Sequence, residues 1–276
     1  MKLQRVLADT AFKLSHSGIE SAARDARILT AYALEVPISD LSLKINDRVS
    51  ANIIFKLEKL ILRRIKREPI SKILGRREFW GRIFSINKNV LDPRADTETL
   101  IDYVIEKPVK TVLELGTGSG VIAVTLACEW KEVHVTATDI SEDALLLAQK
   151  NAEKFNIENK IQFLKSDWFD NVEGKFDLII SNPPYIGWIE QDKICTEVTK
   201  YDPEIALFAG FDGFDAYKKI IPGLAKYLNP DGFVVLEIGA SQSNLVKDIM
   251  NLSGFFNVDI VKDLSGKDRV IAAKLA

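Results

Sequence analysis

Hydrophobic residues in the early part of the chain recur with the period of an α-helix. Residues 51–67 place apolar side chains at three- and four-residue spacing, which predicts an amphipathic helix. Residues 21–34 consist mostly of strong helix formers, and Ser21 is suited to the N-cap of a helix there. We therefore predict an N-terminal helical domain over residues 1–74.

The pattern changes after residue 74. Residues 75–92 bring aromatic and β-branched side chains around Gly81, which predicts a β-hairpin linker. Short apolar runs then alternate with helical segments, as in βαβ units. The runs predicted as strands are 111–115, 133–137, 161–165, 176–181, 233–238, 256–261 and 269–274. The segments predicted as helices are 121–130, 142–155, 215–228 and 241–252. Residues 93–276 thus predict an α/β domain, Rossmann-like, with a doubly wound seven-stranded sheet.

The composition is that of a folded chain that does not cross a membrane. Of the 276 residues, 47% are hydrophobic and 28% charged, which is enough apolar material for a packed core. No apolar run approaches the ~18–20 residues that span a bilayer. Charges interrupt the N-terminal stretch, so we expect no signal peptide and a cytoplasmic protein. Two cysteines without a CxxC spacing and two histidines predict no metal site.

Charge is distributed unevenly along the chain. Residues 1–75 carry 14 Lys and Arg against 8 Asp and Glu, whereas the remainder carries 23 against 31. An acidic body does not indicate a general nucleic-acid binder, and we expect no stable nucleic-acid partner. A basic N-terminal domain could dock an acidic protein. The basic run in residues 56–67 is read first as a solvated helix face.

A glycine-rich loop follows the first predicted strand. It reads Glu114-Leu115-Gly116-Thr117-Gly118-Ser119-Gly120 and runs into a helix. Glycines let the backbone approach a ligand closely, and a helix N-terminus offers free N–H groups. The dinucleotide fingerprint G-x-G-x-x-G would need glycine where the chain has Val121. The closer G-x-G-x-G spacing suits a ligand without a pyrophosphate.

Two further elements lie at the ends of the next strands. Asp139 is placed to accept hydrogen bonds from ribose hydroxyls, or alternatively to cap the helix near Ser141. Asp167 could bind an adenine amino group while Trp168 covers the base. Because the carboxyl ends of parallel strands share one edge, these elements predict a site for S-adenosyl-L-methionine, which would leave as S-adenosyl-L-homocysteine.

The most specific motif is Asn182-Pro183-Pro184-Tyr185, directly after the fourth predicted strand. Residues before proline are held extended, and proline offers a carbonyl without an N–H. The Asn182 side-chain oxygen and the Pro183 carbonyl therefore form two acceptors for one planar –NH2 group, and Tyr185 could pack against its plane. This arrangement predicts methyl transfer to an amide or exocyclic amine, with Asn182 and Pro183 as catalytic residues.

At these residues the chain resembles the peptide chain release factor glutamine methyltransferases. The stretches that carry the resemblance are 21–34, 75–81, 96–100, the glycine loop, Ser166 to Phe169, Ser181 to Ile186, 208–215 and 263–269. The resemblance implies methylation of the glutamine in the Gly-Gly-Gln motif of release factors. It also implies that the N-terminal domain grips the release factor. We expect the enzyme to act as a monomer.

By position, the resemblance assigns the donor site to Gly116 through Gly120, Asp139, Trp168 and Asn182. It assigns the substrate pocket to Asn182 through Tyr185. The family pattern Ile-Pro-Arg-Pro-Asp departs here to Leu91-Asp92-Pro93-Arg94-Ala95-Asp96. Arg94, Glu98, His16 and His134 receive no catalytic role.

Three other functions fit parts of the pattern. An adenine-N6 DNA methyltransferase uses the same Asn-Pro-Pro-Tyr clamp, that is, the two acceptors for one –NH2 group, on a flipped base. Such an enzyme also needs a region that recognises the DNA sequence and a basic groove. A methyltransferase acting on RNA or on a ribosomal-protein glutamine differs mainly in the hairpin and helical domain. A non-catalytic regulator that binds the donor would not need the whole clamp.

Overall fold

The computed structural model describes residues 1–275, which form two compact units. The helical unit comprises Met1–Gly75 together with Thr196–Tyr201. The sheet unit comprises Arg76–Cys195 and the chain from Asp202 onward. The hairpin belongs to the sheet unit. Nothing in the sequence predicts that residues 196–201 belong to the helical unit.

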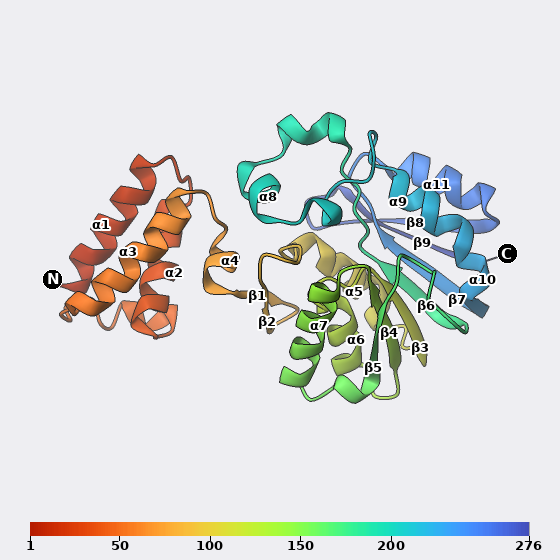
Figure 1. Cartoon of the computed structure of the whole chain (residues 1–276), viewed down its shortest axis with the longest axis horizontal. Coiled ribbons are helices and arrows are strands. Elements are labelled where there is room, and N and C mark those ends of the chain that lie inside the picture. The colour runs from red at the N-terminus through yellow and green to blue at the C-terminus, as the bar shows by residue number, and fades with distance from the viewer. Residues whose placement is uncertain (276) are drawn as a thin grey trace. The chain divides into compact units, whose positions relative to one another are not determined.

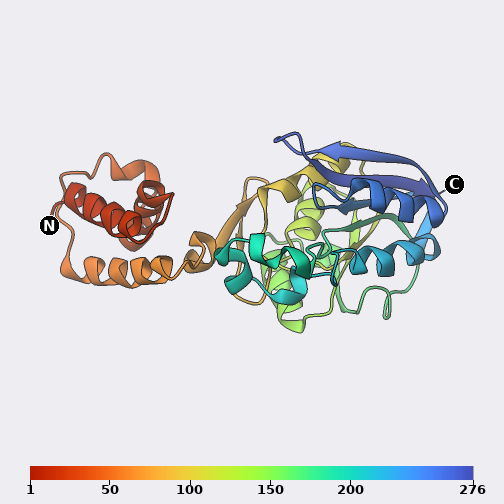
Figure 2. The ribbon, with the colours of Figure 1, turned by 90° about the horizontal axis from the view of Figure 1, so that it is seen from above.

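Helices packed around one core form the helical unit (Figures 1 and 2). They are α1 (Leu3–His16), α2 (Ala22–Leu34), α3 (Ala51–Ile65) and α4 (Ile70–Leu74), with a 3₁₀ turn at Ile38–Leu41. The short helix α8 (Thr196–Tyr201) is also assigned to this unit but adds no buried residue to its core. The core of α1 to α3 includes Leu14, Leu29 and Ile61, each almost fully buried. The helices predicted at 21–34 and 51–67 are confirmed, the second ending two residues early.

Two expectations about the polar residues of this unit are wrong. Ser21 occupies the N-cap position of α2, but its hydroxyl donates to Asp25 Oδ2 at 2.9 Å and makes no cap. Arg64 does not belong to a solvated face, because it is buried and its Nε donates to Asp25 Oδ2 at 2.8 Å. A buried carboxylate needs such a partner, and Arg64 also donates to Glu197 Oε1 of α8 at 3.4 Å.

Seven strands form the main sheet of the other unit, as predicted. They are β3 (Thr111–Leu115), β4 (His134–Asp139), β5 (Ile161–Lys165), β6 (Phe176–Ser181), β7 (Leu228–Glu237), β8 (Phe255–Lys262) and β9 (Asp268–Leu275). Their order is β5-β4-β3-β6-β7-β9-β8, with β3 to β7 parallel and β9 antiparallel to both neighbours. The order reverses between β3 and β6, where doubly wound sheets bind ligands.

Alternate side chains of the strands build two separate cores. Val112 and Ile180 face one core, and Leu113 and Ile179 face the other. The helices are α5 (Glu98–Ile105), α6 (Val121–Glu129), α7 (Glu142–Lys154), α9 (Asp215–Ile220), α10 (Leu224–Tyr227) and α11 (Ser243–Leu252). Figure 1 shows α5 to α7 on one face of the sheet and α9 to α11 on the other. No helix within residues 1–275 is both long and apolar enough to cross a membrane.

Two local features bear on the site. The helix predicted at 215–228 is broken by a 3₁₀ turn, Ile221–Gly223, because Pro222 has no N–H to continue the helix. The hairpin pairs β1 (Arg76–Phe79) with β2 (Arg82–Ser85) through a two-residue turn. Both turn residues, Trp80 and Gly81, have positive φ, as a tight hairpin turn requires.

Candidate active site

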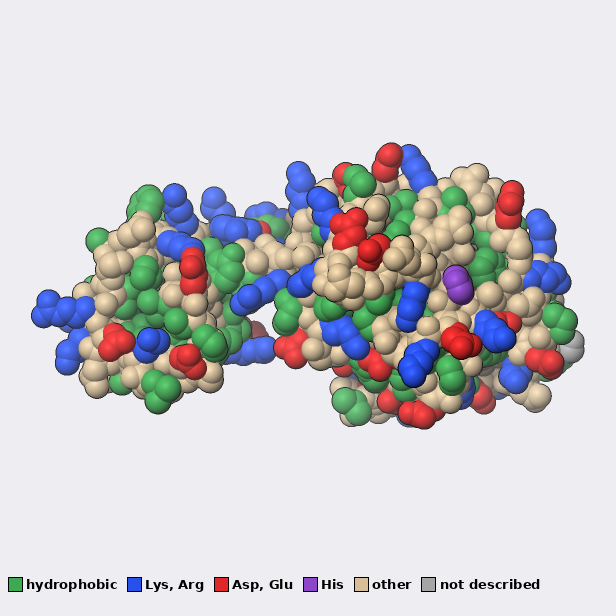
Figure 3. All heavy atoms as spheres, turned by 90° about the horizontal axis from the view of Figure 1, so that it is seen from below, with side chains coloured by type: hydrophobic (Ala, Val, Ile, Leu, Met, Phe, Trp, Pro, Cys, Tyr) green, Lys and Arg blue, Asp and Glu red, His purple; other side chains and the backbone are tan. Residues whose placement is uncertain are grey.

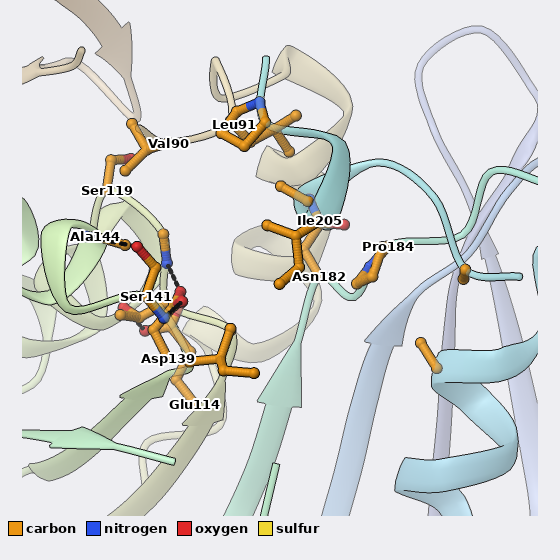
Figure 4. Close-up of a pocket in the computed structure, with 18 of the residues that line it drawn as sticks. Val90, Leu91, Glu114, Ser119, Asp139, Ser141, Ala144, Asn182, Pro184 and Ile205 are labelled. Atoms are coloured by element: carbon orange, nitrogen blue, oxygen red, sulfur yellow. Dashed lines mark hydrogen bonds between the residues drawn. The ribbon is translucent and has the colours of Figure 1, made fainter. Parts of the chain in front are cut away.

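A cavity of about 370 Å³ opens at the carboxyl ends of β3, β4, β5 and β6. Its size is within the range of small-molecule sites. Figure 4 shows Asp139, Ser141 and Ala144 on one side of it and Asn182, Pro184 and Ile205 on the other. The predicted site residues on its wall are Gly116, Thr117, Gly118, Ser119, Asp139, Asp167, Trp168, Asn182 and Pro184. Gly120, Pro183 and Tyr185 are not on it.

The glycines of the loop serve two different purposes. Gly116 and Gly118 have φ of +72° and +55°, and an added Cβ at either would meet no protein atom within 4 Å. Open space in front of a bare backbone leaves room for a ligand to approach closely. An added Cβ at Gly120 would lie 2.9 Å from the Cβ of Ala148. Gly120 therefore allows the loop to pack on α7 rather than touching a ligand.

The buried Glu114 side chain stabilises the glycine loop through hydrogen bonds. Its Oε2 accepts from the Thr117 hydroxyl at 2.6 Å and from the Ala123 N–H at 3.1 Å. The side chain is almost completely buried, and this burial raises the pKa of its carboxyl to about 7. Glu114 thereby ties the glycine loop to the first turn of α6.

Asp139 connects the glycine loop to the start of α7. Its Oδ2 accepts from the Gly118 N–H at 2.8 Å and its Oδ1 from the Ser141 N–H at 2.9 Å. The cap of α7 is Ser141, whose hydroxyl accepts from the Ala144 N–H, so the interpretation of Asp139 as the cap is wrong. Burial raises the pKa of Asp139. Each carboxylate oxygen has a second lone pair, so both retain capacity for a ligand.

Asp167 and Trp168 follow β5 on the same wall. Asp167 is exposed, whereas Trp168 is half-buried with φ of +47°. The Ser166 hydroxyl donates to the Trp168 carbonyl at 2.9 Å and fixes this unusual turn. The carboxylate and the indole both line the cavity, and their contacts with adenine stay a prediction.

The Asn-Pro-Pro-Tyr segment leaves β6 at the opposite wall. The Asn182 Nδ2 donates to the Thr97 hydroxyl oxygen at 3.1 Å. Within residues 1–275, no group donates a hydrogen bond to Asn182 Oδ1 or to the Pro183 carbonyl. Asn182 lies on the cavity wall, and its Oδ1 keeps its hydrogen-bonding capacity. Pro183 is buried and not on the cavity lining, so its carbonyl as the second acceptor stays a prediction.

Tyr185 faces the protein interior. Its hydroxyl donates to Glu237 Oε1 at 3.2 Å, and its carbonyl accepts from Gln242 Nε2 at 2.9 Å. Burial raises the pKa of the Tyr185 hydroxyl. In this position Tyr185 anchors the segment, and its predicted packing against a substrate has no support from the cavity lining.

Arg94 and Glu98 both have partners within the sheet unit. Arg94 pairs with the buried carboxylate of Asp202 at 2.8 Å. Glu98 Oε1 accepts from the Trp80 N–H in the hairpin turn at 2.8 Å.

Three supporting residues have no role predicted from the sequence, although Thr97 lies in the stretch 96–100 that carries the family resemblance. Asn151 is fully buried, and its amide nitrogen donates to the carbonyls of Ser85 and Ser119, joining the hairpin to the glycine loop. Thr97 and Glu237 lie behind the Asn-Pro-Pro-Tyr segment. None stands in a short motif with its partner, so no local signal could have identified them.

Comparison with known proteins places this fold and site in a class. A family model described as "Methyltransferase small domain" matches residues 83–200, and one described as "PrmC N-terminal domain" matches residues 5–75. A crystal structure of a methyltransferase from Pyrococcus furiosus shares the fold, with a TM-score of 0.54 and 22% identity over 78% of this chain and 96% of its own. The sheet unit is a methyltransferase domain.

Relatives along the whole chain narrow the class to a family. A release factor glutamine methyltransferase of Cereibacter sphaeroides is 41% identical over 263 residues, which is 95% of each chain. A bifunctional methyltransferase of Rickettsia felis is 40% identical over 98% of this chain, which spans only 57% of that protein. The chain belongs to the release factor glutamine methyltransferase family.

Proposed function

We propose that this protein transfers a methyl group from S-adenosyl-L-methionine to the side-chain amide nitrogen of the glutamine in the Gly-Gly-Gln motif of peptide chain release factors. The observation that carries the proposal is the shared cavity. The Asn182 side chain lies on one wall of it, while Asp139 and the glycine loop lie on the other. An acceptor for an amide and a cradle for a nucleoside are thereby brought together.

The residues of the cavity fit the methyl donor. Gly116 and Gly118 present bare backbone, Asp139 offers carboxylate lone pairs to ribose hydroxyls, and Trp168 offers an aromatic face. When bound, S-adenosyl-L-methionine supplies a methyl group on a positively charged sulfur. The acidic side chains on the wall suit a ligand that is cationic and lacks phosphate.

Asn182 and Pro183 would act by orienting the amide nitrogen. Conjugation makes this nitrogen a poor nucleophile, as the ~18–20 kcal/mol barrier to amide rotation shows. Two acceptors for its N–H groups increase the electron density on nitrogen and direct its lone pair toward the methyl group. Such alignment contributes several kcal/mol, up to ~7–11 in intramolecular reactions. Methylation acidifies the nitrogen, so its proton can leave late and no general base is needed.

The helical unit would recognise the body of the release factor. Lys and Arg side chains are spread around it on the face shown in Figure 3. Its excess of basic over acidic residues suits an acidic partner surface. We infer a monomeric enzyme that meets a folded protein substrate.

The test is methyl transfer to purified release factor, followed by mass spectrometry of the Gly-Gly-Gln peptide. We expect one added methyl group on the glutamine. Asn182→Ala should lower turnover at least about 10²-fold, as expected for loss of one preorganised polar contact, with a smaller effect on donor binding. A methyl group found instead on DNA, RNA or a ribosomal protein would overturn the substrate assignment. Normal turnover of Asn182→Ala would overturn the clamp.

A further inference from the structure

Thr97 contacts Asn182 at the cavity wall. It ends the 3₁₀ turn η2 (Ala95–Thr97), lines the cavity and is only 2% exposed. Its hydroxyl oxygen accepts from Asn182 Nδ2 at 3.1 Å. Thr97 also occupies the N-cap position of α5, where a threonine hydroxyl ordinarily accepts from the helix backbone, but it makes no such cap. The hydroxyl is thus directed to Asn182 instead of stabilising its own helix.

The polarity of this contact matters because the two ends of an asparagine amide have nearly the same shape. One end is an acceptor and the other carries two donors. A substrate amide nitrogen can be held through its N–H groups only if Asn182 presents its oxygen. If the Asn182 amide were rotated by 180°, its NH2 group would face the NH2 group of the substrate amide.

We propose that Thr97 is a positioning residue that determines which end of the Asn182 amide faces the cavity. The inference rests on the proposed methyl transfer and adds a residue outside the Asn-Pro-Pro-Tyr segment to its machinery. With Nδ2 held by Thr97, Oδ1 is left for the substrate.

Glu237 explains why Thr97 acts as the acceptor toward Asn182. The Thr97 hydroxyl lowers the pKa of the buried Glu237 carboxyl, as a donor to its charged form does. Glu237 Oε1 accepts from Tyr185, while Oε2 has no hydrogen-bond partner within residues 1–275. The carboxylate therefore has room for the hydroxyl hydrogen, and Thr97 then has only lone pairs to offer Asn182.

The experiment measures methyl transfer to intact release factor by the enzyme variants Thr97→Val and Thr97→Ser. Valine keeps the shape of threonine but removes the hydroxyl, whereas serine keeps the hydroxyl and removes the methyl group. We expect Thr97→Val to lower kcat about 10-fold to 10²-fold, in the range for a lost preorganised contact, with the KM for the methyl donor unchanged. Thr97→Ser should restore most of kcat.

Thr125→Val is the matched control. Thr125 lies in α6 outside the cavity lining, and its hydroxyl is buried without a hydrogen-bond partner. We expect this variant to keep wild-type kcat. Wild-type kcat in Thr97→Val, or equal losses in the valine and serine variants, would overturn the positioning role. If the wild-type enzyme itself fails to methylate release factor, the proposed function fails instead, so the two failures are distinguishable.

Discussion

Buried carboxyl groups support both walls of the cavity. Glu114 ties the glycine loop, and Glu237 supports the segment that carries Asn182. Burial raises the pKa of each carboxyl from its usual 4.5 to about 7, while the hydroxyl of Thr117 or of Thr97 favours the charged form. Arg269 also lowers the pKa of Glu237. Glu114 and Glu237 therefore supply hydrogen-bond acceptors on both sides of the cavity, at the cost of removing two carboxyl groups from water.

These shifts predict a pH dependence of stability. A carboxyl group whose pKa is raised by folding holds its proton between pH 4.5 and 7, where the unfolded chain has released it. The free energy of unfolding therefore decreases as pH rises through this window. For Glu237 the change is at most on the order of 3 kcal/mol, from 1.36 kcal/mol per pKa unit.

Glu237→Gln should remove this contribution. As the pH rises from 4.5 to 7, we expect the unfolding free energy of the wild type to fall more than that of Glu237→Gln. Urea unfolding at a series of pH values measures both. Glu132→Gln, at an exposed position, is the control and should leave the pH dependence unchanged. Parallel curves for wild type and Glu237→Gln would contradict the raised pKa.

Among the elements, the parallel strands could be predicted best from the sequence. The predicted bounds of β3, β5 and β6 agree with the structure because each is a short, mostly apolar segment between turn residues. The sequence analysis predicts no helix at α1, α4, α5 or α8. The contacts that hold Asn182 could not be predicted either, since 85 residues separate Asn182 from Thr97 and 52 separate Tyr185 from Glu237. Only the folded sheet brings these partners together.

At the same scale, the buried pair of Arg64 and Asp25 predicts a stability effect. Both side chains are at most 10% exposed. Arg64→Met leaves the buried Asp25 carboxylate without its charged partner, which costs about 3–5 kcal/mol, and it also removes a donor to Glu197 of α8. The neighbouring Arg63 is more exposed; it pairs with Glu68 through two hydrogen bonds and donates to the carbonyls of Lys72 and Ile73, so Arg63→Met should cost less, about 1–2 kcal/mol.

Denaturant unfolding followed by hydrogen exchange would measure both effects. We expect Arg64→Met to lower the unfolding midpoint of the helical unit and to increase amide exchange in α8. If Arg64→Met and Arg63→Met are equally stable, the pair does not hold α8 in the helical unit.

For the whole molecule, the charge asymmetry predicts how the enzyme meets a folded substrate. Arg24 and Arg27 are exposed on α2, so reversing both to Glu should leave folding intact. At low ionic strength we expect the KM for intact release factor to rise several-fold, with less effect at high salt, because a Debye length of ~10 Å at 0.1 M screens exposed charges. A short Gly-Gly-Gln peptide contacts only the cavity, so its kcat and KM should be unchanged.

The matched control reverses two exposed lysines of the sheet unit, Lys131 and Lys175. They precede β4 and β6, at the amino edge of the sheet, whereas the cavity lies at the carboxyl edge. This variant has the same net charge change but should keep the wild-type KM for release factor. If both double variants raise the KM equally, the enzyme responds only to net charge. The helical unit would then have no specific part in docking, and recognition of the release factor would rest on the cavity alone.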